Sequence, residues 1–376
     1  MDSREGRSVS LRAVGDVALI GSAARSLADG GSPAWSETAA FLAAADLTFA
    51  NLEMPMPRSS VEPSWADVSE ELRGRPEALR GLLMAGLDVV CLANNHMMDW
   101  GAIGLAETIE ALAEHGVATV GAGENLDRSI EPAVLERNGL RVGFAAFTPP
   151  HKWTATDSAP GAAPLRTELV RESLDRMGDV DARVVSLHWG VELSNYPTPQ
   201  DRALAREIAD LGVDLLLGHH PHVLQGVERL GRAGVVYSMG NFVFDVTAGR
   251  VQFRCDPWNL RAGYVAEAHL GPDGLASLGT VPTFLDGDGV GVLATGDDAT
   301  RIERLVEEVS RDIEAGSGAV WEHAGGRIVG QRVRVLRGLV RDAGPLFVLR
   351  ELVRIRPRHL RLLWGYAVSR MRRRSR

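Results

Sequence analysis

The chain has 376 residues, 45% of them apolar and 24% charged, with two cysteines and a net charge of −8. These values are ordinary for a globular protein with a sizeable core, and they exclude a disulfide framework. No uncharged apolar run reaches the length of a membrane-spanning helix, and residues 1–10 lack the apolar segment of a signal peptide, so we expect a cytoplasmic protein.

Short apolar runs alternate with helical patterns from the start of the chain to about residue 245. The runs that predict strands are 9–14, 47–50, 88–92, 117–120, 142–147, 184–188, 213–217 and 235–238. Apolar residues at helical spacing predict helices over 75–85, 103–115 and 200–211. This alternation is typical of a layered α/β fold.

The chain changes character after residue 262. Residues 264–270 and 275–285 predict two consecutive strands without a helix between them, and 299–315 predicts a charged helix. A loose, Gly-rich stretch follows at 316–326. We therefore expect a main domain over 9–286 and a helical, Arg-rich C-terminal extension over 299–376.

Five polar clusters follow predicted strands, at the end where ligands bind in α/β sheets. They are Gly15-Asp16, Asn51-Leu52-Glu53, Asn94-Asn95-His96, His188-Trp189-Gly190 and His220-Pro221-His222. We expect all five at one edge of a single sheet. Carboxylate, amide and imidazole donors without a thiolate suit Mn, Fe or Zn better than Cu(I) or an iron–sulfur cluster.

Together these residues resemble the CapA family (poly-γ-glutamate capsule biosynthesis protein), a branch of the calcineurin-like metallophosphoesterases. The matching strings, in order, are AVGD at 13–16, NLE at 51–53, LANNHMMDWG at 92–101, VGAGEN at 120–125, SLHWGVE at 186–192, LLLGHHPHVLQGVE at 215–228 and YSMGNFVFD at 237–245. The resemblance implies a four-layer α/β/β/α sandwich with a two-metal centre between loops.

The resemblance also implies roles for individual residues. One metal would be held by Asp16, Glu53 and His222, and the other by Glu53, Asn95, His188 and His220, with Glu53 bridging the two. His96 resembles the histidine that protonates a leaving group, and Asp99 would orient it. Asn241 and Asp245 would line the substrate pocket, although Gly240-Asn241 is equally a turn.

The sequence departs from typical calcineurin-like enzymes at two points, and the CapA branch shares both changes. Asp16-Val17-Ala18 stands where Asp-x-His is usual, and alanine cannot coordinate a metal. Asn51-Leu52-Glu53 replaces the usual Gly-Asp-x-x-Asp. We therefore expect the first metal to have fewer protein ligands, and the cofactor to be one or two divalent transition metal ions (Mn, Fe or Zn).

Several of these residues could have a purely structural role instead of binding a metal. Asp16 could cap a following helix, and His188 could be a core histidine. We interpret Asn94 as a turn residue and His219 as structural. The histidines outside the clusters are read as ordinary residues: His115, His151, His269, His323 and His359.

The C-terminal segment is strongly basic. Residues 321–376 carry 15 arginines against three acidic residues, about +12, so the rest of the chain carries about −20. Arginines mixed with Val, Leu and aromatic residues over 330–349 and 350–371 are typical of a helix on an anionic membrane surface. A helix docked on the acidic main domain fits equally. No nucleic-acid motif accompanies the arginines, so we expect no nucleic-acid partner.

Two functional hypotheses follow. The first is a metal-dependent hydrolase of the CapA type, linked to capsule or poly-γ-glutamate synthesis, that acts on a phosphoester or an anionic polymer at the cytoplasmic face. The second is a non-catalytic metal-binding subunit or scaffold of a capsule polymer synthase, which Ala18 favours.

Overall fold

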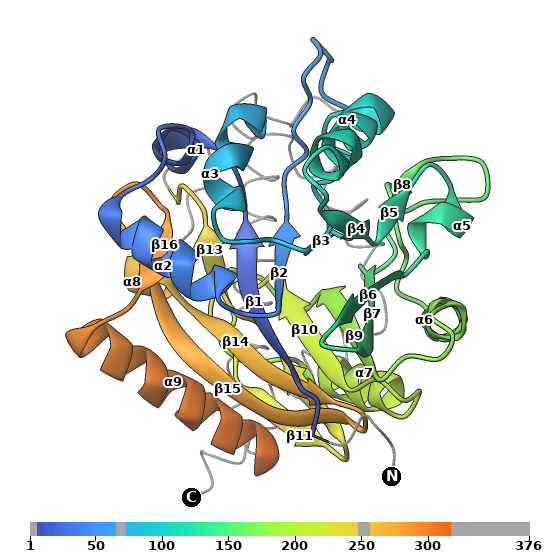
Figure 1. Ribbon diagram of the computed structural model, residues 1–376, viewed down its shortest axis with the longest axis vertical. Coiled ribbons are helices and arrows are strands. Elements are labelled where there is room, and N and C mark those ends of the chain that lie inside the picture. Colours follow the sequence, from blue (N-terminus) through green and yellow to red (C-terminus); the bar gives the residue numbers. More distant parts are fainter. Residues whose placement is uncertain (1–5, 65–72, 247–255, 317–376) are drawn as a thin grey trace, which may run out of the picture.

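The computed structural model describes residues 6–64, 73–246 and 256–316, and its strands form two main sheets (Figure 1). The first sheet has the strand order β16-β15-β14-β1-β2-β3-β4, and β13 also pairs with β1. Its strands are β1 (Val9–Val17), β2 (Leu47–Leu52), β3 (Val89–Cys91), β4 (Ala118–Val120), β13 (Asn241–Val243), β14 (Ala262–Gly271), β15 (Gly274–Leu285) and β16 (Gly291–Leu293).

The second sheet has the order β11-β12-β10-β9-β7-β6. Its strands are β6 (Ala133–Arg137), β7 (Leu140–Phe147), β9 (Ala182–His188), β10 (Leu215–His219), β11 (Val227–Leu230) and β12 (Ala233–Val236). A small ladder, β5 (Ala122–Gly123) with β8 (Gly161–Ala162), lies outside both sheets.

Helices cover the outer face of each sheet. The first sheet packs against α1 (Gly21–Ala28), α2 (Pro33–Ala43), α3 (Leu79–Leu83) and α4 (Gly101–Ala113). The second sheet packs against α6 (Thr167–Arg176), α7 (Pro199–Ala209) and α9 (Gly296–Glu314). Short helices complete the described part of the chain: a 3₁₀ turn (Pro76–Ala78), α5 (Leu126–Ser129) and α8 (Pro257–Arg261). The expected four-layer α/β/β/α sandwich is confirmed.

Side chains along each strand point alternately to the two faces of the sheet, and this alternation creates the layers. In β2, Leu47 and Phe49 enter the core between the sheets, whereas Ala50 and Leu52 pack under the helices of the first sheet. In β10, Leu215 enters the same core between the sheets. Each large apolar side chain buried there contributes about 1.5–3 kcal/mol, so the two sheets are held firmly face to face.

The predicted strands and helices are present, with ends shifted by a few residues. One expectation is wrong: the five polar clusters do not follow strands of a single sheet. Three follow β1, β2 and β3 in the first sheet, and two follow β9 and β10 in the second. The clusters still converge, because the carboxyl ends of these strands lie on the same side of the sandwich (Figure 1).

The start of the expected C-terminal extension packs on the main body. α9 lies against β11, β14 and β15, and it buries Ile302 and Val306. The expected membrane-binding or self-docking helices at 330–371 lie outside the described residues, so this division of the chain stays a prediction. Among the described helices, none has the length and apolar character needed to cross a membrane.

Candidate metal centre

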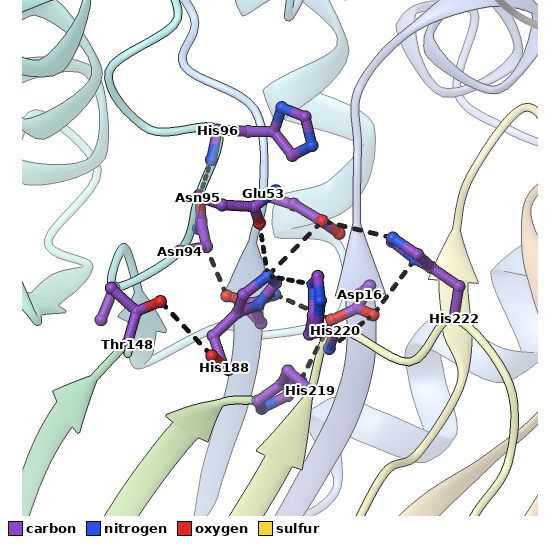
Figure 2. Close-up of polar contacts among 12 residues, drawn as sticks. Asp16, Glu53, Asn94, Asn95, His96, Thr148, His188, His219, His220 and His222 are labelled. Carbon is purple, nitrogen blue, oxygen red and sulfur yellow. Dashed lines mark hydrogen bonds and ion pairs between the residues drawn. The ribbon is translucent and has the colours of Figure 1, made fainter. Parts of the chain in front are cut away.

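The candidate site lies where the two sheets end together. Asp16 and Glu53 come from the ends of β1 and β2, and His188 ends β9. His220 and His222 lie in the loop after β10. Figure 2 shows these five side chains directed toward one another, with Glu53 within reach of imidazoles on two sides. Residues from separate sheets thus form one buried polar cluster.

A bulge in β1 turns Asp16 toward this cluster. Ala13 pairs with Phe49 in β2, but Asp16 pairs with Asn51, so β1 uses one residue more than its partner. The bulge passes through Gly15, where a Cβ atom would lie 2.0 Å from the carbonyl oxygen of Gly240. Asp16 therefore shares the inward face of Asn51, and the alternative of a helix cap does not apply.

The loop after β10 is strained. The backbone φ angle is 95° at His220 and 57° at His222. Both values lie at positive φ, which residues other than glycine rarely adopt. Such residues cost of order 1–3 kcal/mol each and cluster at functional sites. Gly218 lets the loop approach β12, because a Cβ there would lie 2.0 Å from the oxygen of Tyr237. The fold accepts this strain to aim both imidazoles at Glu53.

Two groups of side chains in the described structure could hold a metal ion. One is Asp16, Glu53 and His222 (the Asp16 group), and the other is Glu53, His188 and His220 (the His188 group). Within each group the potential ligand atoms lie within 4.8 Å of one another. Glu53 belongs to both groups, as a bridging carboxylate would.

Glu53 gives the clearest sign that these residues fit a cation. It is fully buried, and within the described residues neither of its carboxylate oxygens accepts a hydrogen bond. Its Oε1 lies 3.4 Å from Nε2 of His222 and 3.7 Å from Nε2 of His188. A buried carboxylate without donors is costly, and a cation between these groups would remove that cost. The donor set therefore fits divalent metal ions.

The electrostatics of the group differ from residue to residue. Burial raises the pKa of Glu53 to about 7. Burial lowers the pKa of His222, but the carboxylates of Glu53 and Asp16 outweigh it and raise the value to about 9. Burial and neighbouring histidines depress the pKa of His188 strongly and that of His220 to about 4. His188 and His220 are thus neutral at pH 7, the form that binds metals.

Asn95 and Asp16 complete the inner part of the cluster. Asn95 Oδ1 lies 2.7 Å from Nε2 of His188, which places this amide oxygen at the edge of the His188 group. Burial raises the pKa of Asp16, but contact with His219 and the charge of His222 outweigh it and leave the value lowered. Asp16 is therefore a carboxylate at neutral pH.

His96 and Asp99 form a separate pair beside the cluster. Nδ1 of His96 lies 2.8 Å from Oδ2 of buried Asp99, while the His96 side chain is 28% exposed. Burial lowers the pKa of His96, but the hydrogen bond and charge of Asp99 raise it above the ordinary value. Asp99 thus holds Nδ1 of His96 and favours the protonated form of its imidazole, which general acid catalysis requires.

The side chains of Asn241 and Asp245 form hydrogen bonds with other residues of the chain. Asn241 places Oδ1 2.9 Å from Nδ1 of His222 and donates through Nδ2 to the carbonyl of Leu260. Asp245 accepts from the backbone N–H and the hydroxyl of Ser22 at 2.8 Å each, so it caps the start of α1. Their expected contact with substrate stays a prediction.

Asn94 and His219 have structural contacts. Oδ1 of Asn94 accepts from the backbone N–H of His96, and its Nδ2 donates to the carbonyl of Leu52, as in a turn. His219 is buried, and its Nδ1 lies 3.4 Å from Oδ1 of Asp16, behind the cluster. It supports Asp16 from the side away from Glu53.

Sequence reasoning assigned no role to three residues near the site. Asn51 bridges Asp16 and His188, and it lies in the same string as Glu53, which was a usable signal. Glu192 closes the string SLHWGVE, and its charge acts on Glu53, His220 and His222. Burial lowers the pKa of His151, and the charge of nearby His96 lowers it further; no sequence signal marks this residue.

Comparison with known proteins identifies the family of this chain. The sequence model of a family described as bacterial capsule synthesis protein PGA_cap matches residues 10–246. The capsule biosynthesis protein CapA of Bacillus anthracis is 30% identical over 330 residues, which cover 85% of this chain and 76% of the relative. The PGA biosynthesis protein CapA of Bacillus subtilis (strain 168) is 32% identical over 206 residues, 54% of each chain.

Two solved structures show partial similarity to this chain. A phosphatase from Mycoplasma pneumoniae has 14% identity and a TM-score of 0.45, covering 73% of this chain and 93% of that one. A 5′-nucleotidase from Candida albicans has 9% identity and a TM-score of 0.40, covering 81% and 58%.

Proposed function

Because this chain belongs to the bacterial capsule synthesis protein family, we propose that it acts in capsule polymer synthesis as a metal-dependent hydrolase. Its substrate would be a phosphoester or an anionic polymer. The Bacillus subtilis relative is named for PGA biosynthesis, which makes poly-γ-glutamate the polymer we favour.

One observation carries the proposal. Glu53 is shared by both ligand groups and is buried without a hydrogen-bond donor in the described structure. The His96–Asp99 pair lies beside the same carboxylate, close enough for the charge of Glu53 to raise the pKa of His96. A bridging carboxylate next to an oriented proton donor is the combination that hydrolysis needs.

The residues divide the chemistry between them. When bound, divalent ions would supply Lewis-acid activation of water and neutralise charge on the substrate. Neutral His188 and His220 would hold one ion, and Asp16 and His222 the other, with Glu53 between them. His96 would pass a proton from its Nε2 to the leaving group, while Asp99 holds Nδ1. The nitrogen and oxygen donors suit Mn, Fe or Zn.

One observation favours the second candidate, a non-catalytic metal-binding scaffold. Ala18 occupies the place where a typical calcineurin-like enzyme has a histidine ligand. It is fully buried in an apolar cluster with Ile20, Met54 and Phe244, so no other donor from that cluster replaces the histidine. The Asp16 group therefore holds its ion with fewer protein ligands.

A matched pair of variants distinguishes the two candidates. We expect the purified protein to contain close to two transition ions per chain and to hydrolyse a generic aryl phosphodiester. His96→Ala should lower turnover by about 10²–10⁴-fold with metal content unchanged. His115→Ala, at an exposed position after α4, is the control. No turnover by the native protein with added Mn²⁺ would favour the scaffold, whereas equal turnover of His96→Ala and the native protein would reject His96 as the general acid.

A further inference from the structure

We infer that Asn51 is a positioning residue that couples the Asp16 group to the His188 group, so that two divalent ions bind cooperatively. The inference rests on the proposed metal use of this site, but it does not depend on hydrolysis. Nothing in the sequence motif assigns Asn51 a role, since the motif is explained by Glu53 alone.

The geometry places one amide group between the two ligand groups. Asn51 is fully buried near the end of β2, directly opposite Asp16 in β1. Its Nδ2 lies 2.8 Å from Oδ1 of Asp16 and 3.3 Å from Nδ1 of His188. Asp16 and His188 belong to different groups, and this amide contacts both of them. His220 also contacts both, through its backbone N–H, which donates to Asp16 at 3.2 Å, and through Nδ1, which lies 3.1 Å from Nε2 of His188.

The neighbours of Asn51 agree on one orientation of its amide. A carboxylate only accepts hydrogen bonds, so the nitrogen of Asn51 must face Asp16. The second N–H then donates to Nδ1 of His188. On the other side, Nδ2 of Asn94 faces Oδ1 of Asn51 at 3.4 Å, which matches the same orientation. Both hydrogens of one amide are therefore shared between the two groups.

This orientation fixes the proton on His188. When Nδ1 accepts from Asn51, a neutral ring carries its proton on Nε2, which lies 2.7 Å from Oδ1 of Asn95 and 3.1 Å from Nδ1 of His220. Nε2 is also the nitrogen that faces Glu53, at 3.7 Å, so it is the nitrogen available to a cation. Ligation through Nε2 requires the proton to be on Nδ1, where it would face an N–H of Asn51.

The conflict couples the groups. An ion at the His188 group favours an Asn51 amide that presents oxygen to His188, and this withdraws the N–H from Asp16. Asp16 then gains more from an ion of its own. The reverse also holds, because an ion at Asp16 releases the amide. Two cations that share Glu53 repel each other. Without the coupling through Asn51, the second ion would therefore bind no more tightly than the first, or more weakly.

Calorimetric titration of the chelator-treated, full-length protein with Mn²⁺ tests the inference. We expect two ions per chain and a Hill coefficient above 1 for the native protein. Asn51→Leu keeps the approximate shape without hydrogen bonds, and Asn51→Ser keeps a single donor in case the leucine variant does not fold. Both should lose the cooperativity and bind Mn²⁺ about 10–100-fold more weakly.

Thr48→Val is the matched control. Thr48 is a buried polar residue on the same strand, and its hydroxyl donates to Leu42 away from the site, so its variant should titrate like the native protein. A Hill coefficient of 1 or less for the native protein, or native titration by the Asn51 variants, would overturn the inference. Cooperative binding of two ions without any hydrolysis would reject the hydrolase proposal and leave the coupling in place.

Discussion

The two sheets make different contributions to the site. The first sheet supplies the oxygen ligands, from Asp16, Glu53 and Asn95, and the second supplies the imidazoles of His188, His219, His220 and His222. Asp16 lies on β1, and Glu53 and Asn95 follow directly after β2 and β3, whereas two of the imidazoles need positive φ angles. Neither half holds a complete ligand group, so the centre exists only where the sheets dock.

The largest expected effect is on metal content, and it differs between Glu53, which both ligand groups share, and His220, which belongs to one group. Glu53→Gln removes the carboxylate that belongs to both groups, so we expect loss of both ions in elemental analysis. His220→Gln alters only the His188 group and should leave about one ion per chain. One ion per chain in both variants would mean that the two groups are not joined through Glu53.

The docking of the sheets can be weakened beneath the site. Phe49 of β2 stacks on Phe144 of β7 across the sandwich, with ring centroids 6.0 Å apart. We expect Phe49→Ala to lower the free energy of unfolding by about 3–5 kcal/mol in urea and to weaken Mn²⁺ binding as well. Met84→Ala, at an exposed position in the helical layer, should change stability by about 0.5 kcal/mol or less. If Phe49→Ala bound Mn²⁺ with the affinity of the native protein, formation of the metal site would not depend on how firmly the two sheets pack together.

The imidazoles of the metal-free protein should affect folding stability in different pH ranges, because their pKa values are shifted in opposite directions. The pKa of His222 is raised to about 9, so its folded state holds an extra proton above pH 6.5 and stability is lost as pH rises toward 9. Glu53, raised to about 7, adds to the loss up to that pH. His220, lowered to about 4, acts oppositely but only between pH 4 and 6.5.

Thermal unfolding in chelator should therefore show stability falling between pH 6.5 and 9, by an amount on the order of 2–3 kcal/mol. Saturating Mn²⁺ or the variant His222→Gln should flatten that window. A profile in chelator that rises between pH 6.5 and 9 would contradict the assigned direction for His222.

The smallest effect concerns Asp245, at the edge of the site. Its carboxylate caps α1 through Ser22, so Asp245→Ala should lower the free energy of unfolding by about 0.5–2 kcal/mol. Ser22→Ala, which keeps the backbone donor, should cost less. A raised KM for the phosphodiester without loss of stability would instead support the substrate contact expected from the sequence.

Most elements of the sandwich could be predicted from periodicity. β9 and β10 are continuous apolar runs, and α7 follows a Thr-Pro start with apolar residues at helical spacing. β6 was missed because its apolar run is only Ala133-Val134-Leu135 and its residues are partly or fully exposed, although it pairs with β7. Local pattern therefore identifies buried strands better than edge strands.

The partition into two sheets could not be predicted in the same way. An apolar strand looks alike in either sheet, and its membership depends on partners that are distant in sequence. The bulge at Asp16 was equally invisible, because the apolar run ended at Val14 and only Gly15 marked the irregularity. The site residues were nevertheless named, since the family strings carry them whichever sheet they follow.

The position of β1 has a consequence for synthesis on the ribosome. β1 lies between β2 and β14, and Arg12 of β1 donates to Glu267 of β14 across 255 residues of sequence. At about 5–20 residues per second, one edge of the first strand stays without its antiparallel neighbour for roughly 10–50 s. An unpaired edge is a template for aggregation, so nascent chains of this protein depend on protection until β14 emerges.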